Sequence, residues 1–285
     1  MTGWETVFVE GAPRIALNVM GEGPLLLFLH GIGSNKSSWD QQLAAFAPHF
    51  TAAAWDARGY GESGDYDGAL DFGDFSADLL RVLKHFGADK AHLCGLSMGG
   101  RIAQDFYPRH PDRVASLVLC DTFAGDDPDD ERSGRSQSIE EFVNSRIQPY
   151  LDGADPAERA PRVAGRLMSP KRPEDAYRRA VAAHAALHVD SYIKTVRASA
   201  AYNRVADLPD IAVPTLLVFG AEDPLTPPHV GEYMAERIPD SRLVVIEDAG
   251  HLTNMERPVA FNEAVLEFLL GVLAADKAKE KAEAR

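Results

Sequence analysis

The chain of 285 residues is 45% hydrophobic and 25% charged, a composition typical of a globular protein with a full-sized core. Its 29 Lys and Arg against 43 Asp and Glu give a formal charge of −14, which argues against binding to nucleic acid or to anionic membranes. The two cysteines lie in apolar runs, which predicts free thiols and no disulfide. We see no secretory leader and no apolar run of the ~20 residues that span a bilayer, so we expect a cytoplasmic protein.

Strands and helices alternate along the first part of the chain. Strands are expected at residues 6–10, 15–20, 25–29, 52–55, 91–96 and 114–119. The last four are apolar on both faces, as central strands of a parallel sheet are. Helices are predicted at 39–46, 75–86 and 99–107. In the second of these, Phe75, Leu79, Leu83 and Phe86 recur at three- and four-residue steps, so one face can pack on a sheet.

The alternation stops between residues 125 and 207. This stretch opens with an acidic loop, which lacks the ligand spacing of a calcium loop and is expected to be solvated, and continues with Arg- and Ala-rich helical segments. Strands at 215–220 and 243–246 and helices at 229–238 and 259–273 then resume the pattern. We therefore predict a doubly wound α/β fold of about eight mostly parallel strands. Its core domain comprises 1–124 and 208–285, with a helical cap inserted at 125–207.

A serine flanked by glycines lies where the strand at 91–96 turns into the next helix. Residues 95–100 read Gly-Leu-Ser-Met-Gly-Gly, the Gly-x-Ser-x-Gly spacing of a nucleophile elbow. Its glycines permit a tight turn that raises the hydroxyl of Ser97 at the sheet edge, and the helix N-terminus behind it favours negative charge. In this setting a nucleophile is a better interpretation of Ser97 than a helix cap.

A serine hydroxyl needs a base that can accept its proton. His251 follows the strand at 243–246, and no other histidine has a comparable position. Asp223 follows the strand at 215–220 and would orient His251 and stabilise its imidazolium form. Glu222 and Asp121, which also follow strands, stay open as alternative acids.

Residues 30–33, His-Gly-Ile-Gly, follow the buried strand at 25–29, where an oxyanion loop belongs. The backbone N–H groups of Ile32 and Met98 are expected to form the oxyanion hole, and one such donor is typically worth roughly 3 kcal/mol of transition-state stabilisation. His30 is expected to brace this loop.

These segments, together with Asp-Ala-Arg-Gly-Tyr-Gly-Glu-Ser at 56–63, resemble the α/β-hydrolase superfamily over the whole chain outside the cap. Within it, residues 96–100 and the segment Ala-Gly-His-Leu-Thr-Asn-Met-Glu-Arg-Pro at 249–258 resemble the 3-oxoadipate enol-lactonase group. The resemblance implies hydrolysis of a small carboxylate-bearing ester or lactone, as in aromatic degradation, through an acyl-enzyme on Ser97.

Other activities fit the same three side chains. They are carbon–carbon bond hydrolysis of a vinylogous diketone from ring cleavage, cofactor-free perhydrolase or haloperoxidase activity, and, in a different class, ligand binding without catalysis. The elbow carries serine, which excludes the aspartate nucleophile of dehalogenases and epoxide hydrolases. No metal or phosphate-loop motif occurs, so neither a metal nor a cofactor is expected. The expected partner is a small-molecule substrate, with no nucleic acid or membrane, and a homo-oligomer stays open.

Arginines of the cap are candidates for binding a substrate carboxylate, because the guanidinium fork matches its two oxygens. The sequence offers Arg146, Arg166 and Arg197. We expect the cap to set specificity, since it would cover the pocket above Ser97.

Overall fold

The computed structural model describes residues 3–134 and 138–283, so residues 135–137 of the predicted cap and the first two and last two residues of the predicted core lie outside it. All described strands form one sheet in the order β1-β2-β4-β3-β5-β6-β7-β8. The strands are β1 Glu5–Val9, β2 Ile15–Met20, β3 Leu25–Leu29, β4 Thr51–Trp55, β5 Ala91–Leu96, β6 Val114–Cys120, β7 Thr215–Gly220 and β8 Ser241–Ile246. β2 is antiparallel to both β1 and β4, and the remaining pairs are parallel. The predicted sheet of about eight mostly parallel strands is confirmed.

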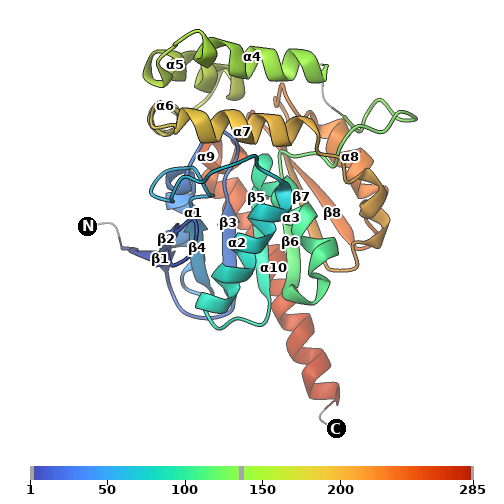
Figure 1. The fold of residues 1–285 in the computed structure, drawn as a ribbon. Helices are drawn as coiled ribbons and strands as arrows, with labels where there is room; N and C mark the ends of the chain where they lie inside the picture. The colour runs from blue at the N-terminus through green and yellow to red at the C-terminus, as the bar shows by residue number, and fades with distance from the viewer. Residues whose placement is uncertain (1–2, 135–137, 284–285) are drawn as a thin grey trace.

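Helices cover both faces of the sheet (Figure 1). They are α1 Asp40–Phe46, α2 Phe72–His85, α3 Met98–Arg109, α8 Pro228–Ala235, α9 Thr253–Glu256 and α10 Pro258–Glu283, with short 3₁₀ turns at Lys36–Trp39, Pro111–Arg113 and Val205–Asp210. In β3, Leu25, Leu27 and Leu29 pack in the cluster that includes α2, α3 and α8, whereas Leu26 and Phe28 pack with α1 and α10. Because both faces are covered, the strand is apolar throughout.

Helix α2 begins three residues earlier than the predicted helix at 75–86. Asp71 and Asp74 form a capping box: the carboxylate of Asp71 accepts a hydrogen bond from the backbone N–H of Asp74, and the carboxylate of Asp74 accepts one from the backbone N–H of Asp71. The apolar periodicity alone does not report this polar start.

Four helices between β6 and β7 lie over the edge at which the parallel strands end (Figure 1). These cap helices are α4 Ile139–Leu151, α5 Pro156–Leu167, α6 Glu174–Ala185 and α7 Val189–Ala200. Helices α4 and α7 share a small apolar core that includes Phe142, Tyr150, Tyr192 and Val196. The cap helices therefore have a core of their own, next to the end of the sheet where the sequence places its candidate catalytic residues.

Helix α10 is long, and its far end projects beyond the sheet (Figure 1). Its segment Pro258–Lys279 is long and apolar enough to cross a membrane by length and composition. Phe261, Val265 and Leu269 are nevertheless fully buried against the sheet. Packing in the protein core thus accounts for these three apolar residues, whereas Val259 and Leu270 of the same helix are exposed.

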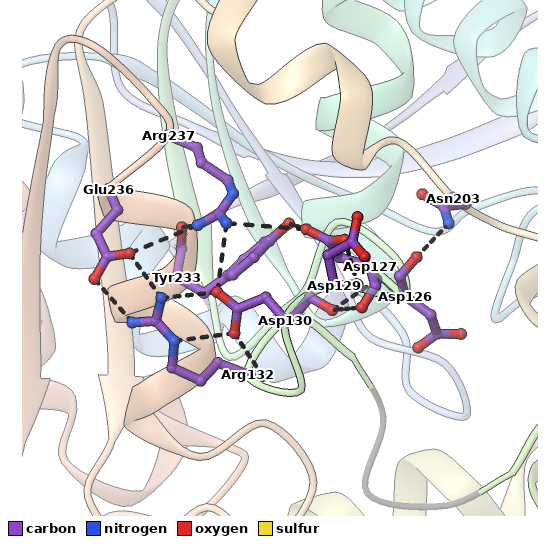
Figure 2. Close-up of polar contacts among 10 residues, drawn as sticks. Asp126, Asp127, Asp129, Asp130, Arg132, Asn203, Tyr233, Glu236 and Arg237 are labelled. Atoms are coloured by element: carbon purple, nitrogen blue, oxygen red, sulfur yellow. Dashed lines mark hydrogen bonds and ion pairs between the residues drawn. The ribbon is translucent and has the colours of Figure 1, made fainter.

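The acidic loop after β6 is not simply solvated as predicted. Figure 2 shows its carboxylates paired with α8 and the turn after it: Arg132 bridges Asp130 and Glu236, each at 2.8 Å, and the hydroxyl of Tyr233 donates to Asp127 at 2.7 Å. The hydrogen bonds from Arg132 lower the pKa of Asp130 to about 2. The loop that leads to the cap is therefore tied to the core.

The two connections of the cap also meet each other. The side-chain amide of Asn203 donates to the carbonyl of Asp126 at 2.8 Å (Figure 2), and the backbone N–H of Arg204 donates to the carbonyl of Ala124 at 2.6 Å. The chain thus enters and leaves the cap side by side.

Candidate active site

Ser97 lies at the turn between β5 and α3, in a backbone conformation that side chains rarely adopt. Its φ is +53° and its ψ is −111°. A Cβ on Gly95 would lie 2.3 Å from the backbone of Gly99, and one on Gly99 would lie 2.0 Å from the carbonyl oxygen of Leu29. Only glycines permit these approaches, so the local sequence and the strained turn that presents Ser97 belong together.

The structure joins His251 and Asp223, from the segments that follow β8 and β7. His251 Nδ1 donates to Asp223 Oδ2 at 2.7 Å, and both residues are 4% exposed. The carboxylate also accepts bonds from the backbone N–H groups of Leu225 and Thr226 and from the Thr226 hydroxyl. Four donors fix its orientation. Thr226 escapes the sequence analysis, although Asp-Pro-Leu-Thr is a spacing in which an aspartate accepts bonds from the following turn.

Opposing effects determine the pKa of His251. Burial lowers it, but the charge of Asp223, the hydrogen bond to Asp223 and the charge of Asp121 raise it more, so the net pKa is above its ordinary value of 6.5. The environment therefore stabilises the imidazolium form, the state that a general base reaches when it accepts a proton.

Ser97 and His251 line the same cavity of about 340 Å³ between the core and the cap helices. No hydrogen bond joins the serine hydroxyl to the imidazole among the described residues, and catalytic hydrogen bonds are often loose before substrate binds. The cavity thus places a candidate nucleophile and a candidate base on one wall, open to a small molecule.

The two predicted oxyanion donors belong to the segments around the cavity: Met98 follows Ser97, and Ile32 lines the same cavity as Ser97. Met98 is the first residue of α3, so its N–H has no carbonyl to bind within that helix. Ile32 lines the cavity in the loop after β3. Nearby, His30 has the contacts of a brace: its Nδ1 donates to the carbonyl of Gly31 at 2.8 Å, and its Nε2 accepts from the N–H of Ala57 at 3.1 Å.

The alternative acids are placed differently from Asp223. Glu222 is exposed. Asp121 is fully buried, but it accepts from the N–H of Gly220 at 2.9 Å and from the hydroxyl of Thr253 at 2.5 Å. Burial, followed by the charge of Asp223, raises the pKa of Asp121 well above its ordinary value. Asp121 thus connects the end of β7 to the segment after His251.

Glu256 is a second buried carboxylate to which the sequence analysis gives no role. It is 1% exposed and accepts from the backbone N–H groups on either side of His251, Gly250 at 3.1 Å and Leu252 at 3.3 Å. It also accepts from the N–H of Ser169, between α5 and α6, at 2.8 Å. One carboxylate therefore holds the loop of His251 against the cap.

The candidate arginines divide. Arg146 and Arg166 line the cavity, whereas Arg197, the third candidate for contact with a substrate carboxylate, is exposed and does not line it. On α7 the buried positions belong to residues such as Tyr192 and Val196. The structure adds two arginines that the sequence analysis does not select, Arg101 and Arg159.

Comparison with known proteins gives consistent matches. Residues 24–258 match the family model described as the alpha/beta hydrolase fold. The chain is 30% identical to 3-oxoadipate enol-lactonase 2 of Acinetobacter baylyi, covering 89% of this chain and 93% of that protein, and 26% identical to a putative carbamate hydrolase, RutD, of Pseudomonas savastanoi, covering 87% and 94%. Among solved structures it resembles a thermophilic esterase from Thermogutta terrifontis with malate bound, at 28% identity, a TM-score of 0.83 and coverage of 94% and 99%.

Proposed function

This chain belongs to the α/β-hydrolase family, and from that premise we propose that it is a serine hydrolase that cleaves a small carboxylic ester or lactone. One observation carries the proposal. His251, hydrogen-bonded to Asp223, lines the same cavity as Ser97, whose backbone has a strained positive φ. The cavity of about 340 Å³ favours a small substrate, because ligand pockets begin near ~300 Å³.

In the proposed reaction, Ser97 Oγ attacks the carbonyl carbon while His251 Nε2 accepts the hydroxyl proton. The N–H groups of Ile32 and Met98 stabilise the resulting oxyanion. The tetrahedral intermediate then expels the alkoxide, which takes the proton from His251, and leaves an acyl group on Ser97. Water attacks this ester with His251 again as base, and the acid leaves as the serine is restored.

The similar proteins support an ester or lactone as substrate. Matches to an enol-lactonase and an esterase favour oxygen esters, and the match to a putative carbamate hydrolase shows that similar sequences can differ in the group they cleave. We further propose that the enzyme works in the cytoplasm without a cofactor, on a free small molecule.

The test compares the parent with Ser97→Ala, using 4-nitrophenyl acetate and a fluorophosphonate probe. We expect ester turnover and covalent labelling in the parent only. Ser145→Ala is the matched control, because Ser145 also lines the cavity but lies on α4. Ester turnover by Ser97→Ala at the parent rate would refute the proposal. An enol-lactone and a ring-cleavage dienone, assayed side by side, then separate ester or lactone cleavage from carbon–carbon bond hydrolysis.

A further inference from the structure

The cavity is positively charged inside a strongly acidic protein. Its lining residues include four arginines, Arg101, Arg146, Arg159 and Arg166, and no aspartate or glutamate among the described residues. The whole chain has a formal charge of −14. Because its described lining includes arginines but no carboxylate, the cavity attracts an anionic ligand although the protein as a whole is negatively charged.

Arg159, near the start of α5, is the arginine whose surroundings point most directly to a ligand. It is half-buried and lines the cavity, and although its side chain hydrogen-bonds to Tyr150, its Nε is buried without a hydrogen-bond partner among the described residues. It also forms no ion pair with a described carboxylate. Its guanidinium lies 5.6 Å from the centre of the Tyr150 ring. A partly desolvated cation without an anionic partner is costly, and a bound carboxylate would remove that cost.

Other partly buried arginines show how this chain usually stabilises such a charge. Arg58 binds the buried carboxylate of Asp78 at 2.7 Å, and Arg204 binds that of Asp105. In both cases the protein supplies the anion itself. At Arg159 the described protein supplies none, and the side chain faces a cavity that also contains the candidate nucleophile.

The neighbours of Arg159 connect it to the oxyanion loop. The Tyr150 hydroxyl is 2.8 Å from His184 Nε2, and His184 hydrogen-bonds to the backbone of Gly33. Burial, opposed by the hydrogen bond with Gly33 and aided by the charge of Arg159, lowers the pKa of His184 to about 4, so the imidazole is neutral near pH 7. Among Arg159, Tyr150 and His184, which come from three cap helices, Arg159 is therefore the only cation.

We propose that Arg159 binds a free carboxylate at the non-reacting end of the substrate, so that the enzyme prefers half-esters or lactones of dicarboxylic acids. This inference rests on the proposed serine hydrolase activity. The proposal assigns the preference for anionic substrates to Arg159, whose guanidinium would bind the carboxylate through two charge-assisted hydrogen bonds.

The experiment follows release of 4-nitrophenol from two esters that share the same reacting group: mono-4-nitrophenyl adipate, with a free carboxylate, and its methyl ester, in which that carboxylate is masked and neutral. We expect the parent to favour the anionic ester in kcat/KM. Arg159→Gln should lose about 10- to 100-fold on the anionic ester, as for removal of a hydrogen-bonded charge, and stay within about threefold on the neutral one. Arg159→Lys should recover part of the loss.

The matched control is Arg162→Gln, which changes an exposed arginine on the same helix that does not line the cavity. It should behave as the parent. Equal losses of kcat/KM on both esters in Arg159→Gln would overturn the assignment of Arg159. Loss of the preference for the anionic ester in Arg166→Gln but not in Arg159→Gln would overturn it too. In either case, fluorophosphonate labelling of Ser97 would still support the hydrolase proposal. If the parent neither turned over either ester nor reacted with the probe, the hydrolase proposal would fail first, and the assignment with it.

Discussion

The two walls of the cavity are built differently. On the core wall, Asp223 and His251 are almost fully buried, and Asp223 accepts hydrogen bonds from His251, Leu225 and Thr226. On the cap wall, Arg146 and Arg159 are half-buried and Arg166 is exposed. The comparison shows that the fold itself holds the acid and the base together, whereas the arginines of the cap wall are less constrained. Substitutions on the core wall should therefore change turnover of every substrate, and those on the cap wall should change preference.

The largest effect is expected on the core wall, from Asp223→Asn. An amide cannot stabilise the imidazolium of His251 and can hold the ring in the wrong tautomer, so kcat/KM should fall about 10³- to 10⁴-fold on neutral and anionic esters alike. The measurement is steady-state kinetics with both adipate esters, with circular dichroism to show that the fold is retained.

Two neighbours serve as controls for Asp223→Asn. Glu222→Gln changes the exposed residue beside it and should stay within about threefold of the parent. Asp121→Asn keeps an oxygen acceptor for the N–H of Gly220 and should cost only a few-fold in activity, which is far less than the loss of a triad acid. A mild Asp223→Asn with a severe Asp121→Asn would transfer the role of the acid to Asp121.

Glu256→Gln should have the next largest effect, because it changes a positioning residue. Its single amide oxygen cannot replace a carboxylate that accepts three backbone N–H groups, and its NH₂ would face one of them. We expect a loss of about 1.5–3 kcal/mol in the free energy of unfolding. We also expect kcat to fall about 10-fold or more on both esters, as the loop of His251 is released.

The readouts for Glu256→Gln are urea denaturation and the ratio of kcat/KM for the two esters. Because Glu256 also binds Ser169 beside the cap, it tests the separation of the walls directly. A changed preference for the anionic ester, without a change in kcat, would show that the two walls are coupled.

The pH dependence reports on the core wall alone. Ester hydrolysis needs neutral His251, so kcat/KM should rise with pH and level off above an apparent pKa higher than 6.5. In Asp223→Asn the residual activity should level off at a lower pH, because burial then acts with less opposition. For stability the sign is opposite: the raised pKa favours the folded state below 6.5, and this contribution is lost as pH rises through the folded pKa. An unchanged pH profile in Asp223→Asn would contradict this account.

The difference between the core wall and the cap wall also explains which site residues can be predicted from the sequence. Ser97, Asp223 and His251 each follow a buried apolar strand, and the end of a parallel strand is a local pattern that places a residue at a known edge. On the cap, the inward face of α5 carries Ala160, Val163, Ala164 and Leu167 at three- and four-residue steps, a pattern that shows an apolar face but not which neighbouring arginine enters the cavity.

Arg159 and Arg197 each adjoin a fully buried residue, Ala160 and Val196, so periodicity alone does not distinguish them, although one lines the cavity and the other is exposed. The contacts of Glu256 with Ser169 join residues 87 positions apart, and those of Asp121 with Thr253 join residues 132 apart. Such partners depend on how the chain closes in space, and no local periodicity reports them.

The smallest effect is expected from Arg132→Gln, in the loop that leads to the cap. Its ion pairs with Asp130 and Glu236 are partly exposed, and such pairs contribute little and are screened by salt. The unfolding midpoint should fall by less than about 3 °C, and the difference should vanish in 1 M NaCl. Turnover of both adipate esters should match the parent. If Arg132→Gln instead weakened the preference for the anionic ester, this loop would position the cap, and selectivity would depend on the core after all.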